Sequence, residues 1–302
     1  MIMVVEQLLN GLSYGLLLFL VAAGLSLVFG IMQVVNLAHG TLFMVGAFAA
    51  VLFVHLTGSF LAAVVLATGV AALLGLAIER LVITHLYRRD HLDQVLATFG
   101  LIVFANDAVR WLSGGLPQYV PPPSALNAAT VLPGGIEYSA YRLAVIVAAG
   151  VVAGAMWLVI ARTRTGMLVR AAASNPAMVG HMGFDVRKVS SLVFAAGSAL
   201  AGLAGVLIAP LISVEVGMGE QILILAFVIV VIGGLGSVRG TFLASMLVGV
   251  LDSLGRAYMP AVLAAFVSSR AAASFAPAFS ATLVYILLAV VLVCRPQGLF
   301  AR

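Results

Sequence analysis

The most constraining feature of this chain is a long stretch without charge. Between Glu6 and Glu79 there is no Asp, Glu, Lys or Arg. Only 8% of the 302 residues are charged and 64% are hydrophobic, whereas about 25% are charged in an ordinary soluble domain. So few charges cannot cover a soluble surface, so lipid must surround most of the chain. The net charge of +5 is spread too thinly to indicate nucleic-acid binding.

Polar, glycine-rich or proline-rich breaks divide the chain into apolar segments. A spanning helix needs about 20 mostly apolar residues. We therefore predict an all-α polytopic transmembrane bundle of about eight or nine spans, with 1–302 forming a single domain. The segments at 221–233 and 241–258 are short and can instead form a re-entrant pair. The predicted spans are 8–31, 38–55, 60–83, 95–113, 140–161, 190–212, 221–233, 241–258 and 278–294.

Basic residues gather in three of the connecting regions. They are Arg88 and Arg89 in 84–94, then Arg162, Arg164, Arg170, Arg187 and Lys188 in 162–189, and finally Arg295 and Arg302 in the tail. Nine crossings place all three regions on one side, and the loops 114–138 and 259–277 on the other. Because cytoplasmic loops carry the excess of Lys and Arg, we expect the basic regions inside and the N-terminus outside.

The longest basic loop, 162–189, contains signals for two short helices. The first is expected at 166–173. Ser174 and Asn175 are good N-cap residues, and Pro176 suits the first helical position. The second helix is then Pro176 to Met182, closed by Gly183. Its spacing places Met178, Val179 and Met182 on one face, and methionines adapt to a partner surface. The alternative is a basic anchor that lies on anionic lipid.

A polar break, Asn36 to Gly40, interrupts the charge-free stretch. Irregular backbone at membrane depth is tolerated only inside protein or against a water-filled cavity. Asn36, His39 and Gly40 are therefore candidates to line a pathway or to hold a broken helix. An ordinary tight turn at the membrane surface is the alternative. A metal site at His39 is not expected, because no second ligand has suitable spacing.

Charges inside apolar segments cost about 2.5–3.5 kcal/mol each on insertion scales, so they need partners or a function. Asp107 and Arg110 are three residues apart, and Asp252 and Arg256 are four apart, so each pair is expected to be self-paired. Glu79 lies near a span end and is expected to snorkel. The carboxylates are too scattered to indicate an acid–base enzyme. The lone Cys294 excludes an internal disulfide.

Five stretches, taken in order, resemble one family: the membrane-spanning permease subunits of ABC importers for branched-chain amino acids. The resemblance covers nearly the whole chain. It rests on Gly24–Gly30 running into Asn36–Gly40, on Arg170–Pro176 with Gly183 downstream, on Gly197–Gly205, on Gly233–Gly240, and on the tail Arg295–Phe300. In many importer permeases the second of these stretches begins with Glu, and here Arg170 precedes the alanines.

The resemblance implies a multi-pass pore subunit in the cytoplasmic (inner) membrane. Its implied partners are a second, similar permease, two cytoplasmic ATPase subunits and an external substrate-binding protein. It also implies that the loop 162–189 holds the coupling helix that contacts an ATPase. Related permeases carry sugars, urea or short amides, so the resemblance leaves the substrate open.

The chain has no Walker motif, and Gly233–Gly240 is not a phosphate loop. ATP and its hydrolysis are therefore expected at partner subunits, and we expect no cofactor on this chain. Because branched-chain side chains are apolar, the pathway should be mostly apolar with few polar groups. Asn36, His39 and Gly40 are its candidates, with Glu215 and Glu220 at the outer mouth. The alternative function is a self-contained secondary transporter or channel whose site is the broken segment.

Overall fold

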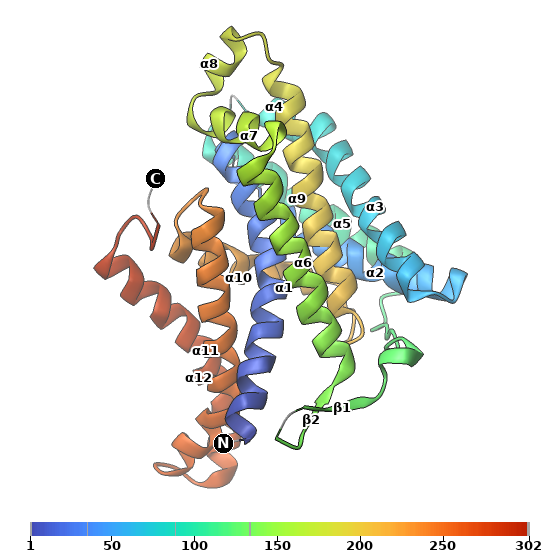
Figure 1. Ribbon diagram of the computed structural model, residues 1–302, viewed down its shortest axis with the longest axis vertical. Coiled ribbons are helices and arrows are strands. Elements are labelled where there is room, and N and C mark those ends of the chain that lie inside the picture. Colours follow the sequence, from blue (N-terminus) through green and yellow to red (C-terminus); the bar gives the residue numbers. More distant parts are fainter. Residues whose placement is uncertain (1, 35, 88, 133, 301–302) are drawn as a thin grey trace.

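The computed structural model describes residues 2–34, 36–87, 89–132 and 134–300, and most of them are helical (Figure 1). The predicted all-α bundle is confirmed, with one two-stranded antiparallel hairpin added to it. The helices are α1 (Ile2–Met32), α2 (His39–Thr57), α3 (Phe60–Ile78), the π-helix η1 (Glu79–Ile83), α4 (Thr84–Leu86), α5 (His91–Ser113), the short 3-10 helix η2 (Ser124–Leu126), α6 (Ala140–Arg162), α7 (Arg164–Ser174), α8 (Pro176–His181), α9 (Val186–Ile208), α10 (Met218–Gly233), α11 (Val238–Ala264) and α12 (Ser269–Cys294); the hairpin is β1 (Ala129–Leu132) and β2 (Ile136–Ser139).

Eight helical segments among the described residues are long and apolar enough to cross a membrane. The ninth apolar helix, α10, has 16 residues and a length of about 24 Å, less than the roughly 30 Å of a hydrocarbon core. The prediction of eight or nine spans is therefore confirmed. The long segments are α1, α2, α3 with its continuation to Leu86, α5, α6, α9, α11 and α12.

Two predicted features near the C-terminus are wrong. The expected outer loop 259–277 is mostly helical, because α11 continues to Ala264 and α12 begins at Ser269. Pro260 and Pro277 lie inside these helices, since membrane helices tolerate proline when neighbouring groups satisfy the freed backbone. The re-entrant pair is also absent from this described region, because α11 has 27 residues and only α10 is short.

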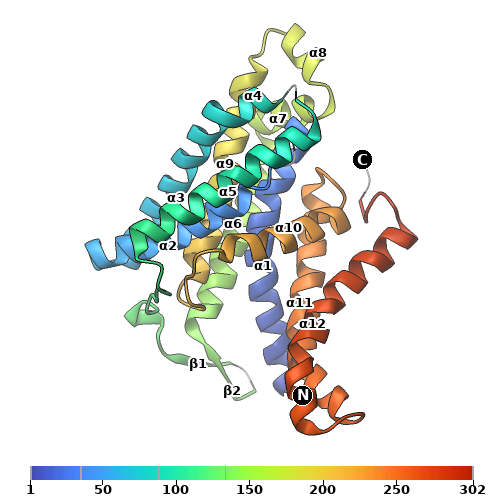
Figure 2. The same ribbon diagram turned by 180° about the vertical axis from the view of Figure 1, so that it is seen from behind.

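The connecting regions are sorted between the two ends of the bundle (Figures 1 and 2). The segments α4, α7 and α8 lie at one end, and the chain's C-terminal tail runs toward that end. The N-terminus, the β1–β2 hairpin and the α11–α12 connection lie at the other. This arrangement agrees with the expected orientation, which makes the α8 end cytoplasmic. Arg88 and Arg302, which entered that expectation, lie outside the described residues.

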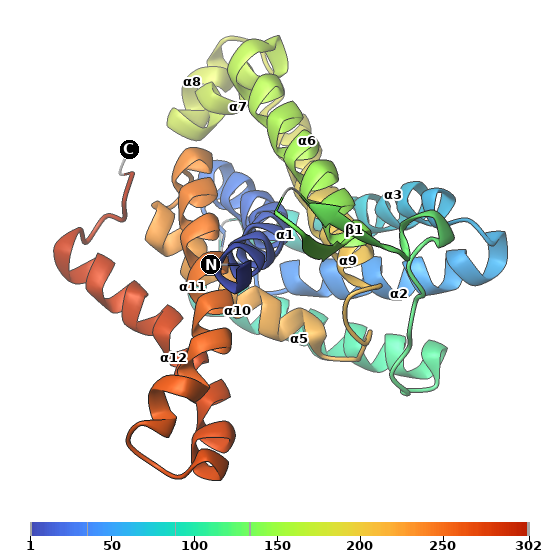
Figure 3. The ribbon, with the colours of Figure 1, turned by 60° about the horizontal axis from the view of Figure 1, so that its bottom comes forward.

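Helix α1 is the central element of the bundle. In its most apolar window 78% of residues are buried, against 11% for α12. It packs against α6, α9, α10 and α11, which lie around it when the molecule is viewed from the N-terminal end (Figure 3). A helix that is hydrophobic on all sides and buried in this way forms the core of a membrane bundle.

Glycines allow α1 to approach its neighbours at backbone distance. A Cβ atom on Gly249 of α11 would lie 2.5 Å from the Cα atom of Gly15. A Cβ on Gly24 would lie 2.5 Å from the carbonyl oxygen of Gly197 in α9. Neither distance is sterically possible, so these positions require glycine. Gly11 and Gly15 of α1 have the GxxxG spacing that often marks close helix packing, and so do Gly150 and Gly154 of α6. A Cβ on Gly150, however, would meet no described atom within 4 Å.

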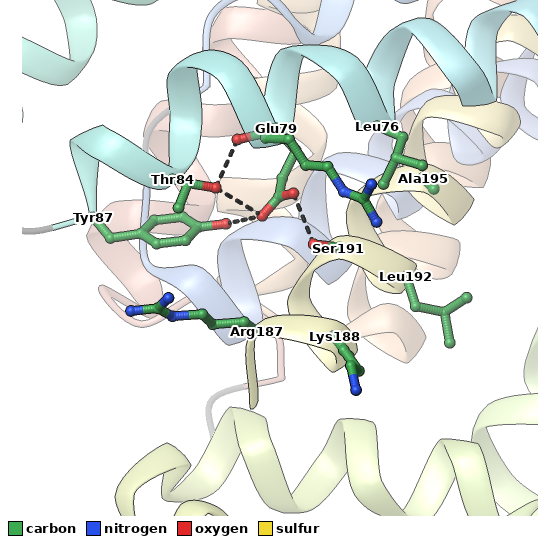
Figure 4. Close-up of a pocket in the computed structure, with 10 residues that line it drawn as sticks. Leu76, Glu79, Thr84, Tyr87, Arg187, Lys188, Ser191, Leu192 and Ala195 are labelled. Atoms are coloured by element: carbon green, nitrogen blue, oxygen red, sulfur yellow. Dashed lines mark hydrogen bonds between the residues drawn. The ribbon is translucent and has the colours of Figure 1, made fainter. Parts of the chain in front are cut away.

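Glu79 joins α3 and α9 at the end of the bundle that carries α7 and α8 (Figure 4). Its side chain is buried, and its carboxylate accepts hydrogen bonds from the Tyr87 hydroxyl and from the Ser191 hydroxyl, both at 2.7 Å. The Thr84 hydroxyl lies 3.3 Å from the same carboxylate. Burial, helped by the bond to Glu79, raises the pKa of Tyr87, so this hydroxyl stays a donor. The expectation that Glu79 snorkels is therefore wrong, because partner hydroxyls satisfy it within the protein.

Replacing Gly249 with Ala should destabilise the bundle, because the new methyl group overlaps the backbone of Gly15. Overpacking of this kind costs about 1–3 kcal/mol. Gly150→Ala is the matched control, since it has the same helix propensity change without the overlap. Thermal unfolding in detergent should show a lower midpoint for Gly249→Ala only; equal midpoints would contradict the close contact.

Glu79→Ala should also destabilise the protein, because it leaves the hydroxyls of Tyr87 and Ser191 without their acceptor. A buried polar group that loses its partner costs about 1–3 kcal/mol. The control is Glu137→Ala, which removes an exposed carboxylate from the hairpin. In the Glu79→Ala background, the further change Ser191→Ala should have little effect on the unfolding midpoint. Full additivity of the two changes would show that the bond does not contribute.

Candidate coupling helix and translocation cavity

The loop 162–189 folds into two short helices as predicted, although α7 spans Arg164–Ser174 and not 166–173, and α8 has the predicted cap. The Asn175 side chain accepts a hydrogen bond from the Met178 N–H at 3.0 Å, and Pro176 occupies the first turn of α8. Gly183 follows with a φ of 83°, the left-handed conformation that favours glycine at a helix end. Helix α8 ends at His181, one residue earlier than predicted. Ser174 is the last residue of α7 and does not cap α8.

The apolar residues of α8 divide into an anchor and an exposed pair. Val179 is 3% exposed and packs in a cluster with Ile31 of α1, Ala172 of α7 and Val193 of α9. Met178 and Met182 are 58% and 68% exposed. The three residues predicted to share a face thus have two environments, because the helix must attach to the bundle through one of them. Helix α8 lies at the extreme end of the molecule (Figure 1).

The break between α1 and α2 is buried inside the protein. Asn36 and His39 are both fully buried, and the Asn36 side chain accepts a hydrogen bond from the Ala38 N–H at 3.0 Å. The His39 Nε2 atom lies 3.2 Å from the carbonyl oxygen of Val21, which is inside α1. A turn at the membrane surface is thereby excluded. The break is an irregular segment held within protein, as required at membrane depth.

The remaining pathway candidates gather near the start of α10. The backbone of Gly40 packs directly against that of Gly219. Glu220 is exposed and accepts a hydrogen bond from the Asn106 amide, and it borders the same crevice as Gly40. Glu215 is exposed in the preceding loop, where it accepts a hydrogen bond from Ser213. Gly40 and Glu220 are therefore neighbours, whereas Glu215 stands apart. Their role in a pathway stays a prediction.

A cavity of about 500 Å³ opens between α1, α10 and α11. It lies in the half of the bundle away from α8, because its α1 residues are in the N-terminal half of that helix (Figures 1 and 3). Its polar and charged lining residues are Gln7, Asn10, Ser13, Tyr14, Arg142, Gln221, Asp252, Ser253 and Arg256. Its apolar lining residues include Leu17, Phe43, Ile208, Met218, Ile222 and Leu225.

An ion pair lines this cavity. Asp252 is 8% exposed, and its Oδ2 atom accepts a hydrogen bond from Arg256 Nε at 2.7 Å. The predicted self-pairing is thus confirmed here, and also for Asp107 and Arg110 at 3.1 Å on the exposed face of α5. The sequence reasoning missed the cavity itself. The sequence feature that pointed to this region was the charge pair Asp252 and Arg256 inside an apolar segment. Nothing in the sequence showed that Gln7 and Arg142 line the same cavity as that pair.

Comparisons with known proteins agree on one family. Residues 7–294 match the family model described as "Branched-chain amino acid transport system / permease component". The chain is 28% identical to the branched-chain amino acid transport permease protein BraD of Pseudomonas aeruginosa, over 98% of this chain and 95% of that protein. It is 27% identical to the permease protein LivH of Escherichia coli, over 84% of this chain and 86% of that protein. No solved structure matches this chain.

The family match covers almost every described helix, from the first turns of α1 to the end of α12. The matched residues include the buried break, the capped α8 and the residues that line the cavity. The match also decides against the alternative of a self-contained secondary transporter. The chain is a multi-pass protein of the inner membrane, and it belongs to the family of branched-chain amino acid transport system permease components.

Proposed function

We propose that this chain is one of two permease subunits of an ATP-driven importer that moves branched-chain amino acids across the cytoplasmic membrane. Its partners in this proposal are a second, similar permease, two ATPase subunits at the α8 end and a substrate-binding protein at the opposite end. ATP is bound and hydrolysed by the ATPase subunits, and this chain binds no cofactor. The relatives BraD and LivH, which are branched-chain amino acid transport permeases, support the substrate class.

The observation that carries the proposal is the form of α8. It is a short helix with a side-chain cap, it is attached to the bundle by Val179, and it presents Met178 and Met182 to the outside. Exposed apolar side chains on a fixed element are expected where another protein docks. Residues Ser174, Asn175, Pro176 and Gly183 shape this contact by setting where the two helices of the loop end and begin.

The cavity supports the other half of the proposal. It combines a polar part with an apolar part inside the membrane-spanning bundle, as expected for a solute with charged ends and an aliphatic side chain. It lies in the half of the bundle away from α8, which in this proposal is the side on which a binding protein delivers substrate. The path then continues toward Gly40, His39 and Asn36, where α2 and α10 meet.

Co-expression with the neighbouring transport genes tests the proposal as a whole. Mild-detergent preparations of this chain should contain ATPase subunits, and proteoliposomes made from them should take up leucine only when ATP is inside with the ATPases. A complex inactivated at the ATPase subunits is the control. Leucine uptake that continues without ATP would contradict the proposal.

Changing Met178 and Met182 together to Asp should uncouple transport from ATP hydrolysis. The two carboxylates would remain desolvated at the contact, so we expect uptake to fall by about tenfold or more. The control M178L/M182L keeps apolar side chains and should retain uptake. Membrane insertion and the thermal midpoint should be unchanged in both variants, since both residues are exposed. Normal ATP-driven uptake by M178D/M182D would show that this surface does not dock.

A further inference from the structure

The ion pair between Asp252 and Arg256 leaves several of their charged atoms without a hydrogen-bond partner among the described residues. Within the described part of the chain, the contact between them involves Oδ2 of Asp252 and Nε of Arg256. The second carboxylate oxygen and the two terminal guanidinium nitrogens take part in no other described bond. The Arg256 side chain is 61% exposed although it lies in a membrane-spanning helix.

The geometry of the pair matches the charged ends of a free α-amino acid. Such a molecule carries an ammonium and a carboxylate on the same carbon atom, and here a carboxylate and a guanidinium lie side by side at 2.7 Å. The substrate's ammonium donates to the free oxygen of Asp252. Its carboxylate accepts from the terminal nitrogens of Arg256, which form a planar fork suited to a carboxylate.

Fixed neighbours hold this part of the cavity in shape. Arg142 donates a hydrogen bond to the Asn10 side chain, which also accepts one from the Tyr138 hydroxyl. The Ser253 hydroxyl donates to the carbonyl oxygen of Gln7 at 2.9 Å. These bonds tie α11, α6 and the hairpin to α1 around the ion pair. The site is therefore built by rigid elements rather than by a flexible loop.

Apolar side chains from α1, α2 and α10 also line the cavity, among them Leu17, Phe43 and Ile222. On α1, Leu17 follows the polar lining residues and is further from the N-terminus than they are. An aliphatic side chain placed there leaves water and contacts only carbon atoms. Phe43 and Met218, which line the cavity, lie close in sequence to Gly40 and Gly219, whose backbones pack together. The bound side chain therefore points toward the place where α2 and α10 meet.

We propose that Asp252 and Arg256 bind the ammonium and carboxylate groups of a zwitterionic aliphatic α-amino acid at an intermediate site in the translocation cavity, with its side chain between Leu17, Phe43 and Ile222. This inference rests on the proposed function, and it names the residues that select the chemistry of the transported molecule. The permease thus binds the substrate selectively through its charged ends after the binding protein has released it.

The double variant D252N/R256Q tests this site in the complete transporter. Asn has the size of Asp, and the Gln amide reaches the position of Arg Nε, so the variant can keep that hydrogen bond while it loses both charges and the terminal guanidinium nitrogens. We expect leucine uptake at saturating loaded binding protein to fall by at least about tenfold. The control D107N/R110Q neutralises the exposed ion pair on α5 and should transport like the wild type. Uptake by D252N/R256Q within twofold of the wild type would overturn the proposal.

A photoreactive diazirine analogue of leucine separates binding from a structural effect. In the wild-type complex, illumination should label peptides that contain Leu17, Phe43 or Ile222, and excess leucine should prevent the labelling. The D252N/R256Q complex should lose it while keeping its thermal midpoint. Should that variant fail to fold, the labelled positions in the wild type decide alone, and labelling confined to other helices would overturn the site. Absence of leucine uptake by the wild-type complex would instead refute the proposed function.

Discussion

The structure depends on the backbone contact between α1 and its neighbours. In lipid, apolar side chains gain little by leaving the solvent, so close packing of small residues must hold membrane helices together. Gly15 meets Gly249 of α11, and Gly24 meets Gly197 of α9, at distances that leave no room for a Cβ atom. One helix thereby fixes two others, and the cavity and the buried break are both formed along its length.

The same helix connects the two ends of the molecule. Its last turn carries Ile31, which belongs to the same apolar cluster as Val179 of α8. Its N-terminal half lines the cavity through Gln7 and Tyr14, and its middle supports His39 through the carbonyl oxygen of Val21. A continuous set of packed contacts therefore runs from α8 to the cavity. A subunit that responds at one end to a partner at the other needs this kind of mechanical connection.

Sequence reasoning succeeded where a single local signal was sufficient. Charge-free apolar runs identified the spans, and Asn175 with Pro176 identified the start of α8. It failed where the result depended on neighbouring helices. The expected loop 259–277 is mostly helical and has Pro260 and Pro277 inside helices. Glu79 is buried against Tyr87 and against Ser191 of α9. The cavity was missed for the same reason, because Gln7 and Arg142 reach Asp252 only through tertiary packing. Such encounters leave no pattern in one sequence.

The central claim is that α8 is the contact through which ATP hydrolysis reaches this chain. Site-specific crosslinking tests it most directly. In a chain whose Cys294 is replaced by Ser, a cysteine at Met178 should crosslink to an ATPase subunit in the assembled complex. A cysteine at Val290, which is exposed on α12, should not. Failure of the Met178 position to crosslink, in a complex that contains the ATPase subunits, would contradict the account.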